Sequence, residues 1–377
     1  MELKKIHISD IGKVVTGKTP RTSVGENYGG NIPFLTPSDD LSYKSAPKTT
    51  KTLTEQGLEE VKNCLLPPHS VCVSCIGSDL GKVVITLEPT VTNQQFNSII
   101  PNKNFNADFV YYLMTLVGRE LNYLSKTSTA VPIINKSSFS NYEVEVPNLE
   151  TQEKIASILS SLDSKIELNR RINDNLEEQA KALFKSWFVD SDRNEWVHYE
   201  LGDITLITAG GDRPSKYTNK KTIECYVPIY SNGIDNEGLY GYTDVAKIHE
   251  ESITISARGT IGYVCLRLEP YVPIVRLISI IPNKKELSAK YLYLWALTQN
   301  ITGTGTTQQQ LTVPIFRKTP ISIPSDTKLK QFNSIADPLF SQIESNKKEN
   351  IKLSTLRDTL LPKLMSGELS VEEVSLD

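Results

Sequence analysis

Two copies of one sequence unit occur in this chain, and the repeat limits the folds available to it. The string SIIPNK spans residues 98–103 and again 279–284, an offset of 279 − 98 = 181 residues. In a longer window, VTNQQFNSIIPNK from Val91 aligns with VPIVRLISIIPNK from Val272 at the same offset. Six identical residues in a row inside an alignable window are not expected by chance, so we predict a duplicated architecture.

Each copy has the pattern of a mixed α/β domain, because short apolar runs alternate with turn residues. Further segments pair between the copies: Ile32–Thr36 with Val227–Ser231, Ser70–Val84 with Ser252–Val264, and Tyr112-Leu113 with Tyr293-Leu294. The middle pair predicts two strands joined by a glycine-containing turn, and the last pair predicts a short helix. The copies end at Pro147 and Pro324, which predicts domains at residues 1–147 and 196–324.

A long helix is predicted after each copy, over residues 148–195 and 325–377. Apolar or small residues recur three or four apart in both segments: Ile155, Leu159, Leu162, Ile166, Leu176, Ala180, Leu183 and Trp187 in the first, and Phe332, Ala336, Leu339, Ile343, Leu353, Leu360 and Leu364 in the second. Helices with such heptad seams need a partner, and each is the simplest partner for the other. We predict an α+β fold in which two repeated domains are separated by an antiparallel coiled coil with pseudo-two-fold symmetry.

Asparagines interrupt both apolar stripes at matching places. Asn169 and Asn173 lie in the first segment, Asn346 and Asn350 in the second, and 346 − 169 equals 350 − 173 at 177 residues. A polar residue in a seam costs stability but fixes the register of the helices. We predict that these four side chains meet near the middle of the pair and set its register; solvated asparagines are the alternative.

Composition sets few limits on function. The 41 Lys and Arg against 44 Asp and Glu give a formal net charge of −3, so any DNA-binding charge must be local or come from a partner. Five cysteines, an odd number, argue against a complete disulfide framework. No apolar run reaches the roughly 20 residues of a membrane helix, and the first residues show no apolar signal segment. We expect a cytoplasmic protein that does not enter a membrane.

Three short motifs suggest chemistry that their surroundings do not support. Gly12–Thr19 matches the phosphate-binding pattern G-x-x-x-x-G-K-T, but Pro20 follows where a helix should begin. Asn31–Phe34 has the letters NIPF of a methyltransferase-like loop, without a glycine-rich cofactor loop in the expected place. Cys72 and Cys75 form one C-x-x-C, whereas a zinc site needs four ligands. We predict no catalytic residue and no metal site in this chain.

Several strings resemble those of the specificity subunits of type I restriction–modification systems, and the resemblance covers essentially the whole chain. They are LFKSWFVDS at Leu183–Ser191, LRDTLLPKLMSGEL at Leu356–Leu369, GKTP at Gly17–Pro20, ARGTIG at Ala257–Gly262 and TGTTQQQ within residues 302–310. The first domain departs from the pattern, since it reads CIGSDLG where the second reads ARGTIG. That segment is one residue longer and has Ile76 in place of Arg258, so the two domains should read different sequences.

The resemblance implies a DNA-binding subunit that is not itself an enzyme. Each domain would be a target-recognition domain for one half of a split DNA site. The helices would separate the domains and dock two methyltransferase subunits, through which restriction subunits would join. S-adenosylmethionine and ATP would be bound only by those partners. Two alternatives remain open here: a self-sufficient enzyme, either a nucleotide hydrolase or a DNA methyltransferase, and a coiled-coil scaffold whose domains bind ligands other than DNA.

Residues that contact DNA should lie on polar turns between the apolar strands, because such turns bring hydrogen-bond donors to bases or phosphates. The candidates in the first domain are Lys18, Thr19, Arg21, Gln94, Gln95, Lys126, Ser128 and Thr129. Those in the second are Arg213, Lys216, Asn232, Arg258, Thr260, Arg276, Thr307, Gln308 and Gln309.

Overall fold

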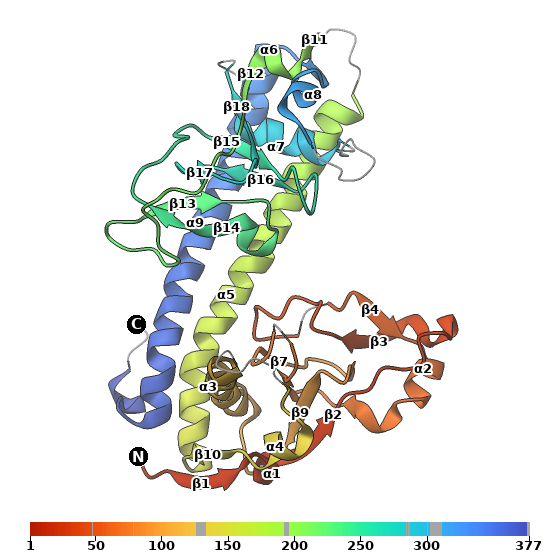
Figure 1. Ribbon diagram of the computed structural model, residues 1–377, viewed down its shortest axis with the longest axis vertical. Coiled ribbons are helices and arrows are strands. Elements are labelled where there is room, and N and C mark those ends of the chain that lie inside the picture. The colour runs from red at the N-terminus through yellow and green to blue at the C-terminus, as the bar shows by residue number, and fades with distance from the viewer. Residues whose placement is uncertain are drawn as a thin grey trace. The chain divides into compact units, whose positions relative to one another are not determined.

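The computed structural model describes residues 1–46, 48–77, 79–125, 133–191, 196–283, 285, 287–299, 301 and 311–374. The chain forms two compact units (Figure 1). Unit 1 comprises Met1–Arg170 and Lys347–Asp377, and unit 2 comprises Arg171–Asn346. Each unit therefore combines one of the two domains with parts of both long helices.

The first domain is built from two four-stranded sheets and a short strand pair. Its elements are β1 (Lys4–His7), α1 (Ile8–Ile11), β2 (Gly12–Thr16), β3 (Tyr28–Leu35), β4 (Lys51–Leu53), α2 (Glu55–Glu59), β5 (Leu65–Leu66), β6 (Val71–Ser74), β7 (Val83–Ile85), β8 (Thr90–Thr92), β9 (Phe96–Pro101), α3 (Ala107–Ser125), α4 (Lys136–Ser140) and β10 (Glu143–Val146). The strand orders are β2-β9-β6-β7, β4-β3-β8-β5 and β1-β10. Only β3 and β8 pair in parallel among these strands.

The second domain repeats this plan with small differences. Its elements are β11 (Val197–Glu200), α6 (Leu201–Ile204), β12 (Thr205–Ala209), β13 (Val227–Tyr230), β14 (Leu239–Thr243), β15 (Ser252–Ile255), β16 (Val264–Arg267), β17 (Val272–Pro273), β18 (Ile278–Pro282), α7 (Ala289–Leu297), α8 (Val313–Arg317) and β19 (Pro320–Ile323). The strand orders are β12-β18-β15-β16, β14-β13-β17 and β11-β19, and β13 pairs with β17 in parallel. The predicted duplication is confirmed.

The repeated string SIIPNK begins within the central strand of one sheet in each domain. Ser98 lies on β9 opposite Cys72 of β6, and Ser279 lies on β18 opposite Thr254 of β15. Both serines are buried, as are the isoleucines that follow them on the inner face, Ile99 and Ile280. A strand with neighbours on both sides and little exposure tolerates few changes in side-chain volume, which accounts for the strong likeness of the two copies here.

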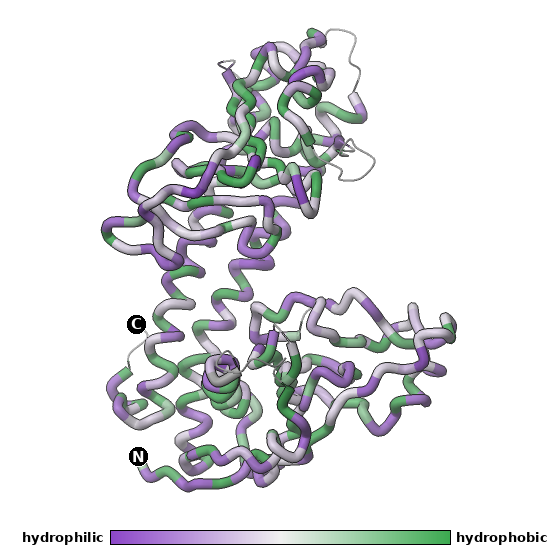
Figure 2. Tube along the Cα trace, viewed as in Figure 1, coloured by the Kyte–Doolittle hydropathy of each residue, from purple (hydrophilic) through white to green (hydrophobic). Residues whose placement is uncertain are grey.

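Each unit contains an antiparallel pair of segments from α5 (Leu149–Phe184) and α9 (Asp326–Ser366), and a π-helical turn (Lys185–Val189) follows α5. In unit 1, Ile155 and Leu159 share a buried core with Leu361 and Leu364. In unit 2, Ala180 and Phe184 share one with Phe332 and Ala336. Figure 2 shows apolar and polar residues alternating along α5 and α9, as the predicted stripes require.

The four asparagines form equivalent hydrogen bonds within the two units. In unit 1, Asn169 Nδ2 donates to Asn350 Oδ1 over 2.9 Å; in unit 2, Asn346 Nδ2 donates to Asn173 Oδ1 over 2.8 Å. Asn350 and Asn173 each donate in turn to a backbone carbonyl of the facing helix. Asn169 is 1% exposed and Asn346 is 5% exposed, so these side chains are not solvated. Their role in setting the register stays a prediction.

Candidate nucleic-acid interface

The first domain brings several of its predicted DNA contacts together. Lys18 and Thr19 follow β2, and Gln94 and Gln95 form the turn between β8 and β9. Thr19 Oγ1 donates to Gln94 Oε1 over 2.7 Å, and the backbone N–H of Cys75 donates to the Gln95 carbonyl over 2.8 Å. Three loops distant in the sequence therefore meet at one edge of the domain.

The phosphate-loop-like string has a structural explanation. Gly12–Thr16 is strand β2, so no loop exists there to wrap a phosphate. Gly17, which follows this strand, lies close to the backbone of Thr92 and Asn93. A Cβ at this position would lie 2.2 Å from the Asn93 carbonyl oxygen. The Lys18 N–H donates to the Thr92 carbonyl over 2.9 Å, which holds the loop against the neighbouring strand. The glycine is required by this contact between strands, since any side chain would collide with the backbone.

A cluster of lysines beside Cys64 adds positive charge to the same domain. Burial raises the pKa of the Cys64 thiol, and the charges of Lys18, Lys136 and Lys13 act against that rise. All three lysines are exposed, and none forms an ion pair within the described ranges. Sequence reasoning named Lys18 alone, because the folded chain brings Lys136 at the start of α4 to the end of β2.

Three predicted cations are already engaged with protein groups. The Arg21 Nε lies 3.1 Å from Glu60 Oε1, and Lys216 Nζ lies 3.2 Å from Asp244 and 3.4 Å from Glu224. The Arg213 guanidinium stacks over the Tyr217 ring at 3.9 Å and donates to the Tyr240 hydroxyl. A cation held this way can still meet a phosphate, but it must share or exchange its partner to do so.

Asn232 connects two turns of the second domain. Its Oδ1 accepts from the Ala257 N–H over 2.7 Å, and its Nδ2 donates to the Val275 carbonyl over 2.6 Å. Arg258 and Arg276 are the residues directly after those two, so one amide positions the backbone of both. Sequence reasoning listed Asn232 as a DNA contact, whereas its amide is used here for positioning.

Two guanidinium groups of the second domain are not engaged in this way. Arg276 is exposed, and its guanidinium has no hydrogen bond or ion pair among the residues that the structure describes. The Nε of Arg258 is buried without a hydrogen-bond partner there. Thr260 is exposed in the same turn as Arg258. Buried guanidinium nitrogens are normally paired, so the Arg258 Nε is an exception within the described part of the chain.

Six predicted contacts lie outside the described residues: Lys126, Ser128, Thr129, Thr307, Gln308 and Gln309. The chain that follows each of these segments returns to an equivalent place. The Ile134 N–H donates to the Cys75 carbonyl over 3.0 Å, and the Leu311 N–H donates to the Ala257 carbonyl over 3.2 Å. Cys75 and Ala257 begin the equivalent β6–β7 and β15–β16 turns, which is a further match between the domains.

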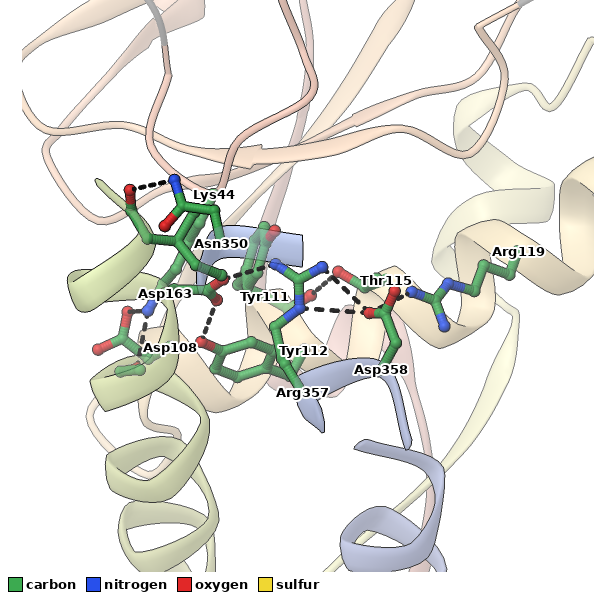
Figure 3. Close-up of polar contacts among 12 residues, drawn as sticks. Lys44, Asp108, Tyr111, Tyr112, Thr115, Arg119, Asp163, Asn350, Arg357 and Asp358 are labelled. Atoms are coloured by element: carbon green, nitrogen blue, oxygen red, sulfur yellow. Dashed lines mark hydrogen bonds and ion pairs between the residues drawn. The ribbon is translucent and has the colours of Figure 1, made fainter. Parts of the chain in front are cut away.

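A polar network attaches the first domain to the helices of unit 1 (Figure 3). Lys44 Nζ lies 2.8 Å from Asp108 on α3 and donates to Ser160 on α5 over 2.7 Å. Asp163 of α5 accepts from Tyr112 over 2.5 Å and pairs with Arg357 of α9 at 2.6 Å. These contacts fix the face of the domain that is turned toward the helices.

The second domain is also attached to the helices through a lysine, but this lysine lies on a helix of the domain. Lys290 of α7 lies 2.7 Å from Glu251 and 3.2 Å from Asp337 of α9. Asp337 is the counterpart of Ser160, because 337 − 160 is also 177. A nearly buried lysine therefore meets the same helix position in each unit, although it comes from a loop in one and from a helix in the other.

The described residues contain no group of three or more His, Cys, Asp or Glu arranged to hold a metal ion. Cys72 and Cys75 are buried free thiols, and burial raises the pKa of Cys72 to about 12. A protonated, buried thiol is a poor nucleophile and a poor metal ligand. Within the described part of the chain, no helix has the length and apolarity needed to cross a membrane.

A family model described as "Type I restriction modification DNA specificity domain" matches residues 1–178 and 193–355. The chain belongs to that family. It is thus a non-catalytic DNA-recognition subunit of a type I restriction–modification system, as the resemblance implied. The two matched ranges fall on the two copies of the repeat.

Relatives support this assignment along the whole chain. The MjaIX specificity subunit of Methanocaldococcus jannaschii is 29% identical over 99% of this chain and 94% of its own length. A putative specificity subunit of Mycoplasma pneumoniae, S.MpnORF507P, is 32% identical over 64% of this chain and 66% of its own. The crystal structure of the type I S subunit from M. genitalium has the same fold, with a TM-score of 0.55 at 18% identity over 97% of this chain and 96% of that one.

The family assignment decides between the readings that the sequence left open. A self-sufficient nucleotide hydrolase or methyltransferase is wrong for this chain, because the family is the non-catalytic specificity subunit. A scaffold that binds ligands other than DNA is likewise excluded by a DNA specificity domain matched in both repeats. Which residues touch DNA is not decided by family membership.

Proposed function

We propose that this chain reads a bipartite DNA site, with one recognition domain on each half of the site. The observation that carries the proposal is the equivalence of the two units, which extends to single hydrogen bonds such as Asn169 to Asn350 and Asn346 to Asn173. A duplicated reader offers the same kind of surface twice, so one chain can read two separate stretches of duplex. Equivalent positions with different chemistry, such as Ile76 and Arg258, favour two different half-site sequences.

The partners in this proposal are double-stranded DNA and two adenine-methyltransferase subunits docked on the helices, with restriction subunits joining through them. S-adenosylmethionine and ATP would be bound by those subunits, and this chain would need no cofactor of its own. The formal net charge of −3 supports a shared interface, because affinity for DNA depends on neutralising phosphates. The positive surface of this chain is local, as at Lys13, Lys18 and Lys136.

Methylome sequencing tests the bipartite site. A host carrying this gene together with its methyltransferase gene should show one methylated motif with two specified halves and an unspecified gap. The control is the same host with the methyltransferase gene alone, which should show no such motif. A single continuous motif, or methylation that does not depend on this chain, would contradict the proposal.

A binding measurement tests the need for partners. The isolated chain should bind DNA poorly, and the complex with methyltransferase subunits should bind its site tightly at the same salt concentration. The salt concentration must be held constant because phosphate contacts make the affinity strongly salt-dependent. Equal specific affinity with and without the partners would count against a shared interface.

A further inference from the structure

Equivalent turns stand at the same edge of the two recognition domains. The turn between β8 and β9 carries Gln94 and Gln95, and the turn between β17 and β18 carries Val275 and Arg276, at the repeat offset of 181 residues. Each turn is closed by one backbone bond, from Phe96 to Asn93 at 3.2 Å and from Leu277 to Ile274 at 3.0 Å. The backbones thus present two side chains at the same place in each domain, but the side chains differ.

The turn in the second domain is strained. Val275 has a φ of 51° and Arg276 a φ of 60°, a region that β-branched and long side chains rarely occupy. Gln94 and Gln95 have no positive φ. Strain of this kind persists only where surrounding contacts enforce it, and it gathers at functional sites.

The contacts that enforce the strained turn come from both sides. The Val275 N–H donates to the Gly211 carbonyl and the Arg276 N–H donates to the Gly210 carbonyl, both over 2.9 Å. Asn232 holds the Val275 carbonyl from the other side. Gly210 itself has no room for a side chain, since a Cβ would lie 2.7 Å from the Ile274 nitrogen. The result is a rigid turn with Val275 49% exposed and Arg276 extended into solvent.

The turn in the first domain is held by side chains instead. Thr19 donates to Gln94 Oε1, and Asn93 Nδ2 donates to Gln95 Oε1 over 2.9 Å. An amide oxygen has two lone pairs, so Gln94 keeps one acceptor site and both N–H donors for another partner. Its amide is oriented before any DNA arrives, which lowers the entropy lost on binding.

We propose that these two turns are the base-reading elements of the domains, with Gln94 reading an A·T pair in the first half-site and Arg276 a G·C pair in the second. The chemistry follows from the major-groove code: a carboxamide pairs with adenine N6 and N7, and a guanidinium pairs with guanine O6 and N7. Val275, beside Arg276, offers an apolar contact suited to a thymine methyl group. The inference rests on the proposed function, since it assumes that each domain reads one half-site.

The other cations among the predicted DNA contacts differ from Arg276, because their side chains already have partners within the domain. Arg21, Arg213 and Lys216 are engaged with acidic or aromatic side chains of their own domain. Among the described residues, Arg276 is bonded through its backbone and not through its guanidinium, which leaves the guanidinium available for two parallel hydrogen bonds. Contacts to phosphate carry no sequence information, whereas two parallel hydrogen bonds from a planar guanidinium to a base edge do.

The test uses the complex with methyltransferase subunits and a DNA library randomised in both half-sites. In Arg276→Gln, the preference for G·C at one position of the second half-site should fall about 10- to 100-fold or shift to A·T, because a good bidentate pair gives that much discrimination. The first half-site should not change. In Gln94→Ala, one A·T position of the first half-site should lose its preference while the second half-site is kept.

Two further variants separate the possible causes of a loss. Arg276→Lys keeps the positive charge but not the planar fork, so it should lose discrimination while retaining most of the salt-dependent affinity. The matched control is Arg317→Gln, which removes an exposed arginine of α8 that packs beside Gly202 and should leave both half-sites unchanged.

Three outcomes would overturn parts of the account, and they can be told apart. Equal weakening of Arg276→Gln on all sequences would make Arg276 a phosphate contact and end the proposal. A change in the wrong half-site would end it as well. A wild-type complex without two specified half-sites would instead contradict the proposed function itself.

Discussion

One pair of equivalent seam positions carries an ion pair with a buried carboxylate in unit 1 and two apolar side chains in unit 2. Asp163 and Arg357 of unit 1 correspond to Phe340 and Ala180 of unit 2, because 340 − 163 and 357 − 180 are both 177. Asp163 is 8% exposed and lies 2.6 Å from Arg357, while Phe340 and Ala180 lie in one apolar core. The two chemistries support the same antiparallel helix pair.

The asparagine pairs of the two units do not differ in this way. The Asn169–Asn350 and Asn346–Asn173 bonds are kept in both units, together with the bonds to the carbonyls of Ile166 and Ile343. Ordinary packing positions of the seam can therefore exchange an ion pair for apolar contacts, whereas the asparagine pairs, which we predict to set the register, are present in both units. This agrees with the general finding that a buried ion pair is weak evidence for stability and a seam asparagine is good evidence for register.

Breaking the ion pair should produce the largest effect. Arg357→Ala leaves the Asp163 carboxylate buried without its cation, which we expect to lower the free energy of unfolding of unit 1 by about 3–5 kcal/mol. Denaturant unfolding of the full chain measures this loss. The double variant Asp163→Leu with Arg357→Leu should recover most of it, since apolar residues replace the pair as in unit 2. A double variant as unstable as the single one would show that the pair itself stabilises the seam.

Removing one asparagine from each unit sharpens the comparison. Asn169→Ala and Asn346→Ala each leave a partner amide unsatisfied, and we expect a loss of about 1–3 kcal/mol in either case. The loss should be larger for Asn169, because its additional partner is the charged Glu349 at 2.7 Å, whereas the additional partner of Asn346 is the neutral Gln342 at 2.8 Å. Denaturant unfolding of the two variants compares them directly, and a larger loss for Asn346→Ala would contradict this ranking.

The smallest expected effect is a loss of stability at low pH through two carboxyl groups, those of Glu60 and Asp244. Backbone hydrogen bonding by Arg21 lowers the pKa of Glu60 below 4.5, and hydrogen bonding by Lys216 lowers the pKa of Asp244 below 3.8. A lowered pKa in the folded state contributes stability that is present above the unfolded value and is lost as pH falls through the folded value. The contribution of Glu60 should begin to fade at a higher pH than that of Asp244. NMR titration of the folded chain, with Glu60→Gln and Asp244→Asn used to assign the two signals, should find both pKa values below those of the unfolded chain. A folded pKa at or above the unfolded value for either carboxyl would contradict the prediction.

Much of the fold follows from the sequence, because the repeat and the heptad stripes are local patterns. SIIPNK fell on equivalent central strands, and Ile155 and Phe332 fell in the helix cores. The start of α5 at Leu149 lies directly after the first repeat. The spacing of apolar residues is sufficient to predict such helices and strands, because the buried face of each one recurs at a fixed interval in the sequence.

The candidate interface could be predicted only in part. Polar turns were correctly placed between strands, as for Gln94 and Arg276, because turn residues interrupt the apolar runs. The αL conformation of Val275 could not be predicted, since it is imposed by Gly210, Gly211 and Asn232 from other loops. Lys136 was missed for the same reason: α4 contacts β2 only once the chain has folded.

We predict that the helices set the spacing between two independent recognition domains, and an insertion tests this prediction most directly. Four residues added between Arg171 and Ile172, with four more between Lys348 and Glu349, keep each asparagine pair within its own unit. A helix over the 38 residues Thr151–Phe188 spans roughly 57 Å at about 1.5 Å per residue, and we predict half-sites about 10 base pairs apart. The insertion adds roughly 6 Å to each helix.

Methylome sequencing of this insertion variant beside the wild type gives the answer. The account predicts two unchanged half-sites and an unspecified gap longer by about one or two base pairs, given the rise of duplex DNA. Retained methylation with an unchanged gap would contradict the spacing role of the helices, and altered half-sites would show that the helices themselves read bases.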